Sequence, residues 1–360
     1  MLTRHTAIRH AGADRRRAGQ LHCTVGATDL SLRAPMPNLR DECWAITDHA
    51  AGNQRQALAL ATQMCCTVRH LQLEPRAPWS WLAPRLLLGG RIALPPDQRG
   101  LFAAPWPGVT IGCGRAAALF TRMLRSLSGG RCYTVQILDP RIDPAQWDTV
   151  IAPRHDQLDG ANVLQPLGSL NPVDDAWLAD GRNSCPRFAD LPQPRVGVLL
   201  GGPRQGVAMG NGYVRQLLAQ LRARQRDDGG SLLVLASRRT PPAWIELFRH
   251  ALRDVPGLVW AGHDDGSNPY AGVLGWADRL VVTPDSVNML SEACAVGCPV
   301  HTLISGPLPG KLTRFHGALR ATGRLHDLDT VTSIRPAPLR ETAAIAIEVR
   351  RRIAQRLATR

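Results

Sequence analysis

The sequence predicts an α/β protein of two Rossmann-type, doubly wound domains that face each other across a cleft. The chain has 360 residues, and roughly 150 residues per domain suggests about two domains. Short apolar runs alternate with helical patterns in two series, which is typical of parallel sheets with right-handed crossovers. A stretch rich in Pro, Asp and Asn at 171–194 separates the two series. Ligands commonly bind in the cleft of such an arrangement.

Residues 1–40 form a segment of their own ahead of the first series. They hold seven arginines, with Asp14 and Asp29 as their acids, and no helical or strand period is sustained. An arginine-rich, acid-poor start suits a transit peptide. The plainer interpretation is that the chain begins functionally at Met36 and that 1–40 is a disordered or mis-assigned extension.

The first series predicts an N-terminal domain over 41–190. Ala57, Leu58, Ala61 and Met64 share one face of a helix that follows the first strand. The expected strands are 43–47, 108–113, 131–138, 149–152 and 163–165, and the expected helices are 54–64 and 115–126.

The second series predicts a C-terminal domain over 191–330, followed by a C-terminal helical segment at 331–360. Thr240, Pro241 and Pro242 together indicate a helix start, with threonine as the cap and proline in the first turn. The expected strands are 195–200, 231–236, 258–261, 279–283 and 299–304. The expected helices are 214–224, 242–253, 270–277, 286–296 and 342–358.

Charge and cysteine usage exclude several classes of protein. The net charge of +14 suggests an anionic partner, but Lys311 is the only lysine, which points to codon bias. No motif of a nucleic-acid binder is present, so nucleic acid is not an expected partner. The nine cysteines are scattered and no pair has C-x-x-C spacing, so we expect buried thiols in a reducing cytosol and no metal or cofactor.

The best-defined motif runs from Ser286 to Val300. Asp285 or Ser286 can cap a helix just beyond a strand, and the N–H groups of such a helix start are a natural seat for phosphate. Glu292 lies about two turns further on. The alternative is an ordinary crossover helix with a surface glutamate.

This stretch resembles the donor domain of GT-B glycosyltransferases. The sequence from Ser291 to Pro299 is similar to the equivalent stretch of the lipid-linked N-acetylglucosaminyltransferase of peptidoglycan synthesis. The resemblance implies that Glu292 accepts hydrogen bonds from the donor ribose. It also implies that Ser286 and nearby backbone N–H groups hold a phosphate, with Asn288 in the same site.

Further motifs strengthen the resemblance. They fall in order as Thr47-Asp48, Ala51-Gly52-Asn53, Gln56, Gln136–Pro140, Ala152–Asp156, Gly201-Gly202-Pro203, Thr240-Pro241-Pro242, Asn268-Pro269-Tyr270 and Trp276–Glu292. Together they resemble the bacterial "mitochondrial fission" family, named for plant elongated-mitochondria proteins and regarded as GT-B-like. The plant member recruits a dynamin-related protein, so a non-catalytic interaction protein that keeps the fold is the alternative function.

Three further segments are candidates for the donor site. Gly201 and Gly202 follow a strand and would let the backbone approach a diphosphate; the alternative is a tight turn. Ser237, Arg238 and Arg239 follow another strand, where arginines can bind phosphate in a bidentate manner; the alternative is a solvated loop. Asn268 could shape a base pocket or belong to a simple loop.

Candidates on the acceptor side follow strands of the first domain. Asp48 could deprotonate an acceptor hydroxyl or cap its loop, and His49 is a poorer candidate for the base. His155 and Asp156 are a second acid–base pair or an internal hydrogen bond. The residues Gly52, Asn53 and Gln56 are expected to bind acceptor or to start the helix.

The segment Trp79–Trp106 combines tryptophans with arginines. Such a composition suits a patch facing anionic lipid, and the alternative is a packed excursion. We therefore expect a cytoplasmic, metal-independent glycosyltransferase that uses a nucleotide-sugar, with a glycolipid acceptor at the membrane surface. A third interpretation is an epimerase of the same fold.

Overall fold

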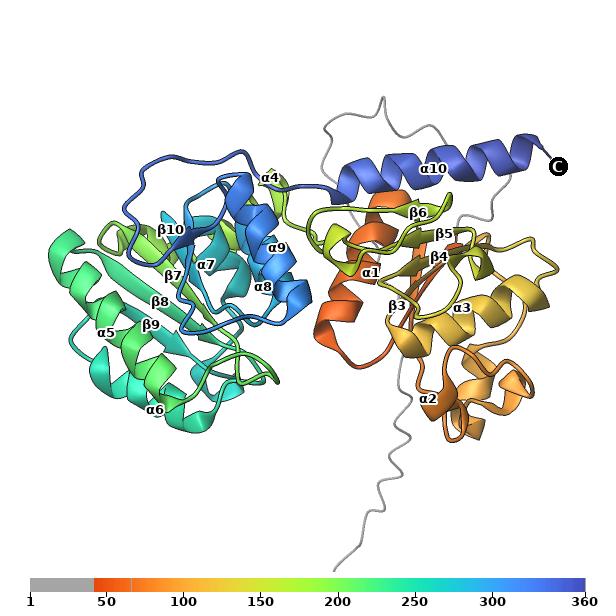
Figure 1. The fold of residues 1–360 in the computed structure, drawn as a ribbon, viewed down its shortest axis with the longest axis horizontal. Helices are drawn as coiled ribbons and strands as arrows, with labels where there is room; N and C mark the ends of the chain where they lie inside the picture. The colour runs from red at the N-terminus through yellow and green to blue at the C-terminus, as the bar shows by residue number, and fades with distance from the viewer. Residues whose placement is uncertain (1–41, 66, 360) are drawn as a thin grey trace, which may run out of the picture.

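The computed structural model describes residues 42–65 and 67–359, so the predicted extension at 1–40 lies outside the described residues. Two six-stranded sheets, in which all neighbouring strands run parallel, form two bodies side by side (Figure 1). The first sheet has the order β2-β1-β3-β4-β5-β6 and the second β12-β11-β10-β7-β8-β9. The predicted pair of doubly wound sheets is confirmed.

The first sheet and its helices form the N-terminal domain. Its strands are β1 (Glu42–Thr47), β2 (Thr67–Gln72), β3 (Val109–Cys113), β4 (Tyr133–Ile137), β5 (Thr149–Ile151) and β6 (Val163–Leu164). Its helices are α1 (Ala51–Met64), α2 (Trp79–Leu82) and α3 (Arg115–Leu127). Every residue of β3 and β4 is buried, as expected for central strands covered on both faces.

Two details of this domain differ from the prediction. The face of α1 in the core contains Leu60, which is fully buried, whereas Leu58 only packs against the edge of that cluster. Strand β2 was not expected, because Val68 and Leu71 are its only large apolar residues. It is an edge strand, paired with β1 alone, and an edge strand can carry polar side chains.

The second sheet and its helices form the C-terminal domain. Its strands are β7 (Arg195–Leu200), β8 (Ser231–Ala236), β9 (Gly257–Trp260), β10 (Arg279–Val282), β11 (Val300–Thr302) and β12 (His326–Asp327). Its helices are α4 (Asp175–Ser184), α5 (Asn211–Asp228), α6 (Pro242–Ala251), α7 (Tyr270–Trp276), α8 (Val287–Cys294) and α9 (Gly310–Ala321). In the described residues, the short 3₁₀ helices are η2 (Gly90–Ile92), η3 (Pro96–Leu101), η4 (Pro144–Gln146), η5 (Arg154–Asp156), η6 (Pro186–Asp190) and η7 (His263–Asp265).

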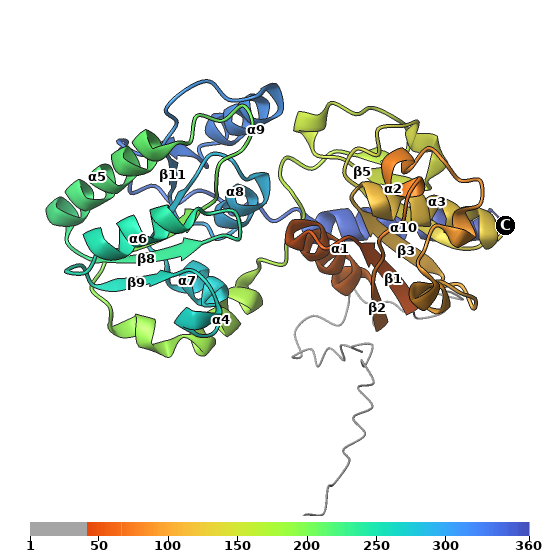
Figure 2. The same cartoon turned by 90° about the horizontal axis from the view of Figure 1, so that it is seen from below.

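Helix α4 lies in the stretch that the sequence predicts as a linker. The carboxylate of Asp174 caps it by accepting from the N–H of Trp177 at 2.8 Å. The helix packs closely on α7 (Figure 2), and a Cβ on Gly181 would lie 2.3 Å from the carbonyl oxygen of Ala271. Leu178 and Phe188 join the core of the C-terminal domain. The segment is therefore part of that core, and its few apolar residues concealed this from the sequence.

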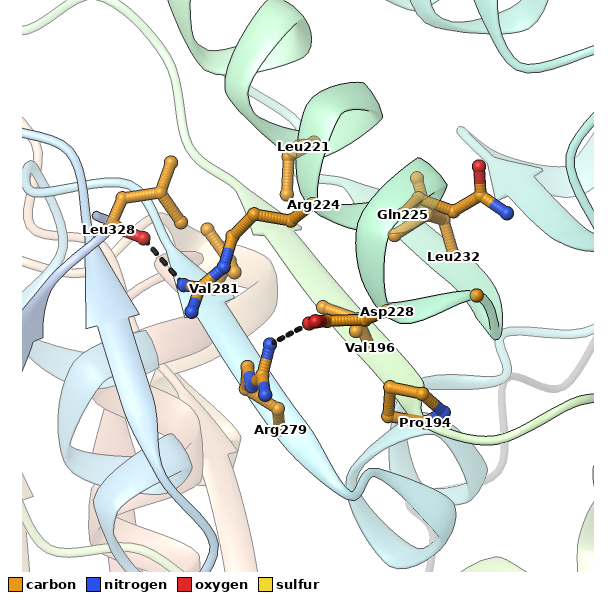
Figure 3. Close-up of a pocket in the computed structure, with 11 residues that line it drawn as sticks. Pro194, Val196, Leu221, Arg224, Gln225, Asp228, Leu232, Arg279, Val281 and Leu328 are labelled. Atoms are coloured by element: carbon orange, nitrogen blue, oxygen red, sulfur yellow. Dashed lines mark hydrogen bonds and ion pairs between the residues drawn. The ribbon is translucent and has the colours of Figure 1, made fainter. Parts of the chain in front are cut away.

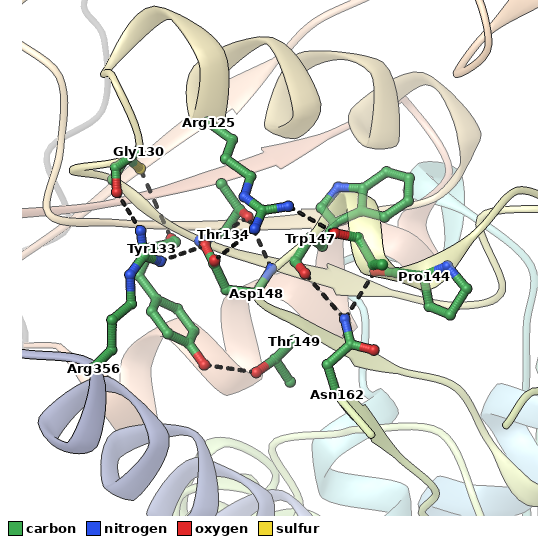
Figure 4. A network of polar contacts seen from close by, with 12 residues as sticks. Arg125, Gly130, Tyr133, Thr134, Pro144, Trp147, Asp148, Thr149, Asn162 and Arg356 are labelled. Carbon is green, nitrogen blue, oxygen red and sulfur yellow. Dashed lines mark hydrogen bonds and ion pairs between the residues drawn. The ribbon is translucent and has the colours of Figure 1, made fainter. Parts of the chain in front are cut away.

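Helix α10 (Thr342–Ala358) returns to the N-terminal domain and lies along α1 (Figure 1). Ala346, Val349 and Ile353 are buried in the core under α1. Arg356 anchors its far end, because its guanidinium lies 2.7 Å from the carboxylate of Asp148 (Figure 4). Asp148 also accepts from the N–H of Thr134 at 2.8 Å. The chain thus crosses between the two domains twice.

A buried histidine makes the stability of the C-terminal domain depend on pH. His301 in β11 is fully buried, and burial together with the nearby Arg224 and Arg279 lowers its pKa from 6.5 to about 4. The neutral ring is therefore favoured in the folded state, and the unfolded chain binds a proton first as pH falls. Stability from this group is complete above pH 6.5 and is lost as pH falls toward 4.

We expect the free energy of unfolding to fall by about 2–3 kcal/mol between pH 7 and pH 4.5 through His301 alone. Denaturant unfolding at the two values measures this. The variant His301→Leu should lose that part of the pH dependence, whatever it does to stability at pH 7. An equally steep loss in the variant would assign the pH dependence to other groups.

Candidate functional site

A cleft of about 750 Å³ lies between the two domains, beyond the carboxyl ends of their strands. The N-terminal wall comes from the segments that follow the six strands β1 to β6. The C-terminal wall comes from the segments that follow β7, β8 and β10 and from the start of α9. In Figures 1 and 2, α8 and α9 form the side of the C-terminal domain nearest the N-terminal domain. The expected interdomain site is therefore present as a real hollow.

The lining of the cleft is basic. Its cationic side chains are Arg85, Arg115, Arg141, Arg204, Arg239 and Lys311, and its acidic side chains are Asp139, Asp156 and Asp285. Each of these carboxylates has an arginine or lysine partner within 3.3 Å. Among the described residues, Arg85, Arg115 and Arg204 have no carboxylate partner, so the cleft attracts anions.

On the C-terminal wall, Asp285 is fully buried and organises the arginines. It accepts from Thr283 Oγ1 at 2.7 Å and from Arg239 Nη2 at 2.5 Å. Its backbone oxygen accepts from Arg204 Nη1 at 2.8 Å. Ser286 is the cap of α8, because its Oγ accepts from the N–H of Met289 at 3.3 Å. Arg204 was missed by the sequence reasoning, although it follows β7 closely.

Gly201 and Gly202 allow two loops to approach each other behind this wall. A Cβ on Gly202 would lie 2.0 Å from the carbonyl oxygen of Arg239, and one on Gly201 would lie 2.1 Å from Asp285. The N–H of Gly201 donates to Thr283 Oγ1 at 2.8 Å, and the N–H of Gly202 donates to Asp285 Oδ2 at 3.4 Å. The absence of side chains at the two glycines thus allows Arg239 and Asp285 to approach this loop closely. Contact of Gly201 and Gly202 with a diphosphate stays a prediction.

Helix α1 touches helix α8 directly across the domain boundary. Gln56 Nε2 donates to Asn288 Oδ1 at 3.4 Å. A Cβ on Gly52 would lie 2.0 Å from Asn288 Nδ2, so a larger residue there would displace the Asn288 side chain. The expected acceptor-side residues and a donor-side residue therefore meet at one point.

Glu292 is part of the same contact. Arg55 Nη1 donates to both of its carboxylate oxygens at 2.8 Å, and the hydroxyl of Tyr270 donates to Oε2. The Glu292 side chain is 3% exposed. Burial and the neighbouring carboxylate raise the pKa of Tyr270 well above its usual range, so its phenol stays protonated as a donor. Glu292, which the sequence predicts to bind the donor ribose, is therefore already paired with Arg55 of the N-terminal domain.

Asp48 lies at the end of β1 and is tied into its own loop. Its carboxylate accepts from the N–H of Ala50 at 2.9 Å and from Asn53 Nδ2 at 3.0 Å. Gly114, in front of it, lines the cleft, and a Cβ there would lie 3.2 Å from Asp48 Oδ2. Asp48 itself is not among the residues that line the cleft. Next to it, the exposed His49 lies 3.5 Å from Glu74.

His155 and Asp156 form a second contact between the domains. Arg314 of α9 donates two bonds to the His155 carbonyl oxygen, at 3.1 and 2.9 Å. Lys311 Nζ lies 2.5 Å from Asp156 Oδ1, whereas His155 Nε2 is 4.0 Å from the same oxygen. Burial lowers the pKa of His155, so the ring is neutral at neutral pH. It lines the cleft and can accept a proton there.

Six predicted donor residues lie outside the lining of the cleft, namely Gly201, Gly202, Ser237, Arg238, Asn268 and Glu292. Ser237 Oγ accepts from the N–H of Arg239 at 3.2 Å, and Asn268 Oδ1 accepts from the N–H of Tyr270 at 3.0 Å. Arg238 is exposed. Ser237 and Asn268 therefore support residues that reach the cleft or Glu292.

A second cavity, of about 20 Å³, lies under α5 (Figure 3). The Arg279–Asp228 ion pair of 2.9 Å borders it. It has room for about one water molecule. It lies at the opposite ends of the strands from the cleft and is too small for a substrate.

The described residues contain no group of three or more His, Cys, Asp or Glu side chains placed to hold a metal ion. Burial raises the pKa of Cys294 and of Cys298 to about 12, so these thiols stay protonated. Nor does any helix between residues 42 and 359, residue 66 aside, have the length and apolar character needed to cross a bilayer.

Two facing Rossmann-type sheets with a cleft at their carboxyl ends define a GT-B-like protein. The fold is shared with UDP-GlcNAc 2-epimerase from Methanocaldococcus jannaschii, at a TM-score of 0.51 and 10% identity over 85% of this chain and 92% of that one. Within this class, the chain belongs to the mitochondrial fission ELM1 family, whose model matches residues 51–353.

Two relatives extend this assignment. The mitochondrial fission protein ELM1 of Arabidopsis thaliana is 30% identical over 279 residues, 69% of this chain. The match covers 65% of the plant protein, less than two thirds of its length. The uncharacterized protein RP120 of Rickettsia prowazekii (strain Madrid E) is 24% identical over 296 residues, 72% of this chain and 82% of that protein.

Proposed function

We propose that this chain is a metal-independent glycosyltransferase that binds a nucleotide-sugar in the cleft. The region 191–330 would hold the donor and the region 41–190 the acceptor. The observation that carries the proposal is the basic C-terminal wall, where Arg204, Arg239 and the start of α8 line one hollow. A diphosphate is a doubly charged ligand that fits arginine forks and a helix N-terminus.

The leaving diphosphate needs its charge neutralised. Arg204 is exposed and has a backbone carbonyl as its partner, so its remaining N–H groups are available to phosphate oxygens. Arg239 already neutralises the buried Asp285, so Arg204 supplies the larger share of free positive charge. Such fixed donors stabilise a leaving group without a metal ion.

Ribose binding by Glu292 would require the Arg55–Glu292 pair to open. The pair joins residues 237 apart in the sequence, so its opening separates α1 from α8. In this proposal the donor replaces Arg55 as the partner of Glu292. The same observation favours a second function, a non-catalytic interaction protein whose ribose site is occupied by its own chain.

A nucleotide panel separates the two functions. Purified full-length protein is heated with uridine, guanosine, cytidine and thymidine diphosphates and their sugars. A transferase should be stabilised by one base, and the stabilisation should be lost in Glu292→Ala. An interaction protein should give a flat panel with every nucleotide, in both wild type and Arg55→Ala.

Asp48 is our candidate for the general base. We expect Asp48→Asn to keep donor binding and to lower turnover by at least about 100-fold, since a positioned base contributes on that order. Release of the nucleoside diphosphate from the donor measures turnover. The exposed Asp159→Asn is the matched control. Wild-type turnover in Asp48→Asn would mean that Asp48 only caps its loop.

A cytoplasmic location, with peripheral contact to a membrane that supplies a glycolipid acceptor, belongs to the same proposal. Epimerisation at this cleft would instead need an acid–base pair around the sugar. His155 and Asp156 are less suited to that role, because Asp156 is engaged by Lys311. Product analysis with the donor alone, without acceptor, separates an epimerase from a transferase.

A further inference from the structure

Five of the nine large apolar side chains that are exposed in the described residues lie on one segment, and the other four are Val331, Ile334, Ile347 and Leu357. Trp81, Leu82, Leu88, Ile92 and Leu101 are between 37% and 85% exposed, and all lie between β2 and β3. We call these five residues the apolar rim. The segment around α2 protrudes from the N-terminal domain (Figure 1). Exposed apolar side chains that gather on one protruding segment are typical of an interaction site.

The rim stands on a firmly packed base. Trp79 is buried and donates its ring N–H to the carbonyl oxygen of Leu88 at 2.9 Å. Trp106 packs against Trp44 at 6.0 Å between ring centroids. Of the tryptophans expected to face lipid, Trp79 and Trp106 therefore serve the core, and Trp81 faces outward at 74% exposure.

Three arginines lie between the rim and the cleft. Arg85, Arg115 and Arg141 come from three separate segments and all line the cleft. Arg85 Nη2 donates to the carbonyl oxygen of Arg141 at 3.0 Å, and Arg115 Nη2 donates to that of Ser80 at 3.1 Å. Arg115 is thus tied to the residue that precedes Trp81. We call these three arginines the arginine cluster.

Two arginines of the cluster lack a compensating charge. Arg141 lies 3.3 Å from Asp139, while Arg85 and Arg115 have no carboxylate partner in the described part of the chain. An anion bound at guanidinium groups without a carboxylate partner offsets their positive charge. Guanidinium groups recognise phosphate oxygens through paired N–H donors.

We propose that the acceptor is a lipid with a phosphate headgroup. Its phosphate binds the arginine cluster, and the apolar rim inserts beside it into the membrane. The proposal rests on the proposed function, because it names the acceptor class for the same cleft. Charge complementarity between the arginines and a phosphate supports this acceptor. The apolar rim, the arginine cluster and the cleft are also continuous with one another through Ser80, Trp81 and Arg85.

Vesicle sedimentation with the full-length chain tests this proposal. We expect binding to phosphatidylcholine vesicles that contain phosphatidic acid, and weaker binding to phosphatidylcholine alone. Arg85→Gln with Arg115→Gln should lose about fivefold in affinity for each arginine removed. The matched control is the exposed pair Arg226→Gln with Arg351→Gln. Equal loss in the control pair would mean that net charge, and not this cluster, binds the vesicles.

A second measurement separates a lipid from a free phosphate. Inorganic phosphate should stabilise the wild type against heat through the arginine cluster, and Trp81→Ala should weaken vesicle binding while leaving that stabilisation unchanged. Phosphate stabilisation without any vesicle binding would overturn the lipid assignment. If neither vesicles nor inorganic phosphate bind, the arginine cluster is not an anion-binding site.

The nucleotide panel keeps this failure distinct from failure of the proposed function. Arg204 and Arg239 are unchanged in the Arg85/Arg115 variant, so nucleotide binding should persist there. Nucleotide binding without vesicle binding refutes only the proposal that the acceptor is a lipid with a phosphate headgroup. Vesicle binding without stabilisation by any nucleotide refutes the proposal that the cleft binds a nucleotide-sugar donor.

Discussion

Replacing Arg55 by alanine is expected to have two large and opposite effects. The free energy of unfolding should fall by about 3 kcal/mol, because the buried Glu292 carboxylate loses the cation that compensates it. Affinity for the nucleotide should rise, because Glu292 is then free for ribose hydroxyls. Denaturant unfolding measures the first effect and titration with the nucleotide from the panel measures the second.

The controls separate the two roles of the pair. Arg222→Ala removes an arginine from the more exposed Asp254 and should change stability much less. Arg55→Ala with Glu292→Ala should recover part of the lost stability and bind nucleotide weakly. If Arg55→Ala is destabilised but binds no better, Glu292 serves to hold the domains together and is not the ribose ligand.

Arg204→Ala should weaken binding of a nucleoside diphosphate by about 10- to 100-fold, the range expected for a lost charge-assisted hydrogen bond. Stability should hardly change, because Arg204 is exposed and its one partner is a carbonyl oxygen. Calorimetric titration with the stabilising nucleotide measures this.

The specificity of that result needs two comparisons. Arg226→Ala removes an exposed arginine of α5 outside the cleft and should bind normally. Arg238→Ala tests a residue that the sequence predicts in the donor site and that lies outside the lining of the cleft. Unchanged binding in Arg204→Ala would remove the C-terminal wall from the phosphate site.

Much of the fold could be predicted because parallel strands are buried on both faces. The segments 195–200 and 231–236 coincide with β7 and β8, since continuous apolar runs mark such strands. Helix α9 was missed although Leu312, Phe315, His316 and Leu319 share its buried face. His316 interrupts the apolar pattern, and its Nε2 lies 3.0 Å from the carbonyl oxygen of Pro284.

The candidate site could be predicted only where it follows strand ends. Residues predicted from that rule that do line the cleft are Asn53, Gln56, His155, Arg239, Ser286 and Asn288. The partners of those residues come from distant parts of the chain, such as Arg55 for Glu292 and Lys311 for Asp156. No local pattern signals that a polar side chain is already engaged across a domain boundary.

The most direct test of a nucleotide-sugar site in the cleft is a thermal-shift panel on wild type and Arg204→Ala. A nucleotide at 100 times its dissociation constant stabilises a protein by about 2.7 kcal/mol. We predict such a shift with one base. The stabilisation should fall to about 0.4–1.4 kcal/mol in Arg204→Ala, whose affinity is 10- to 100-fold weaker, and should stay unchanged in Arg226→Ala. An undiminished shift in Arg204→Ala, or no shift in wild type with any of the four bases, would contradict the account and favour an interaction protein.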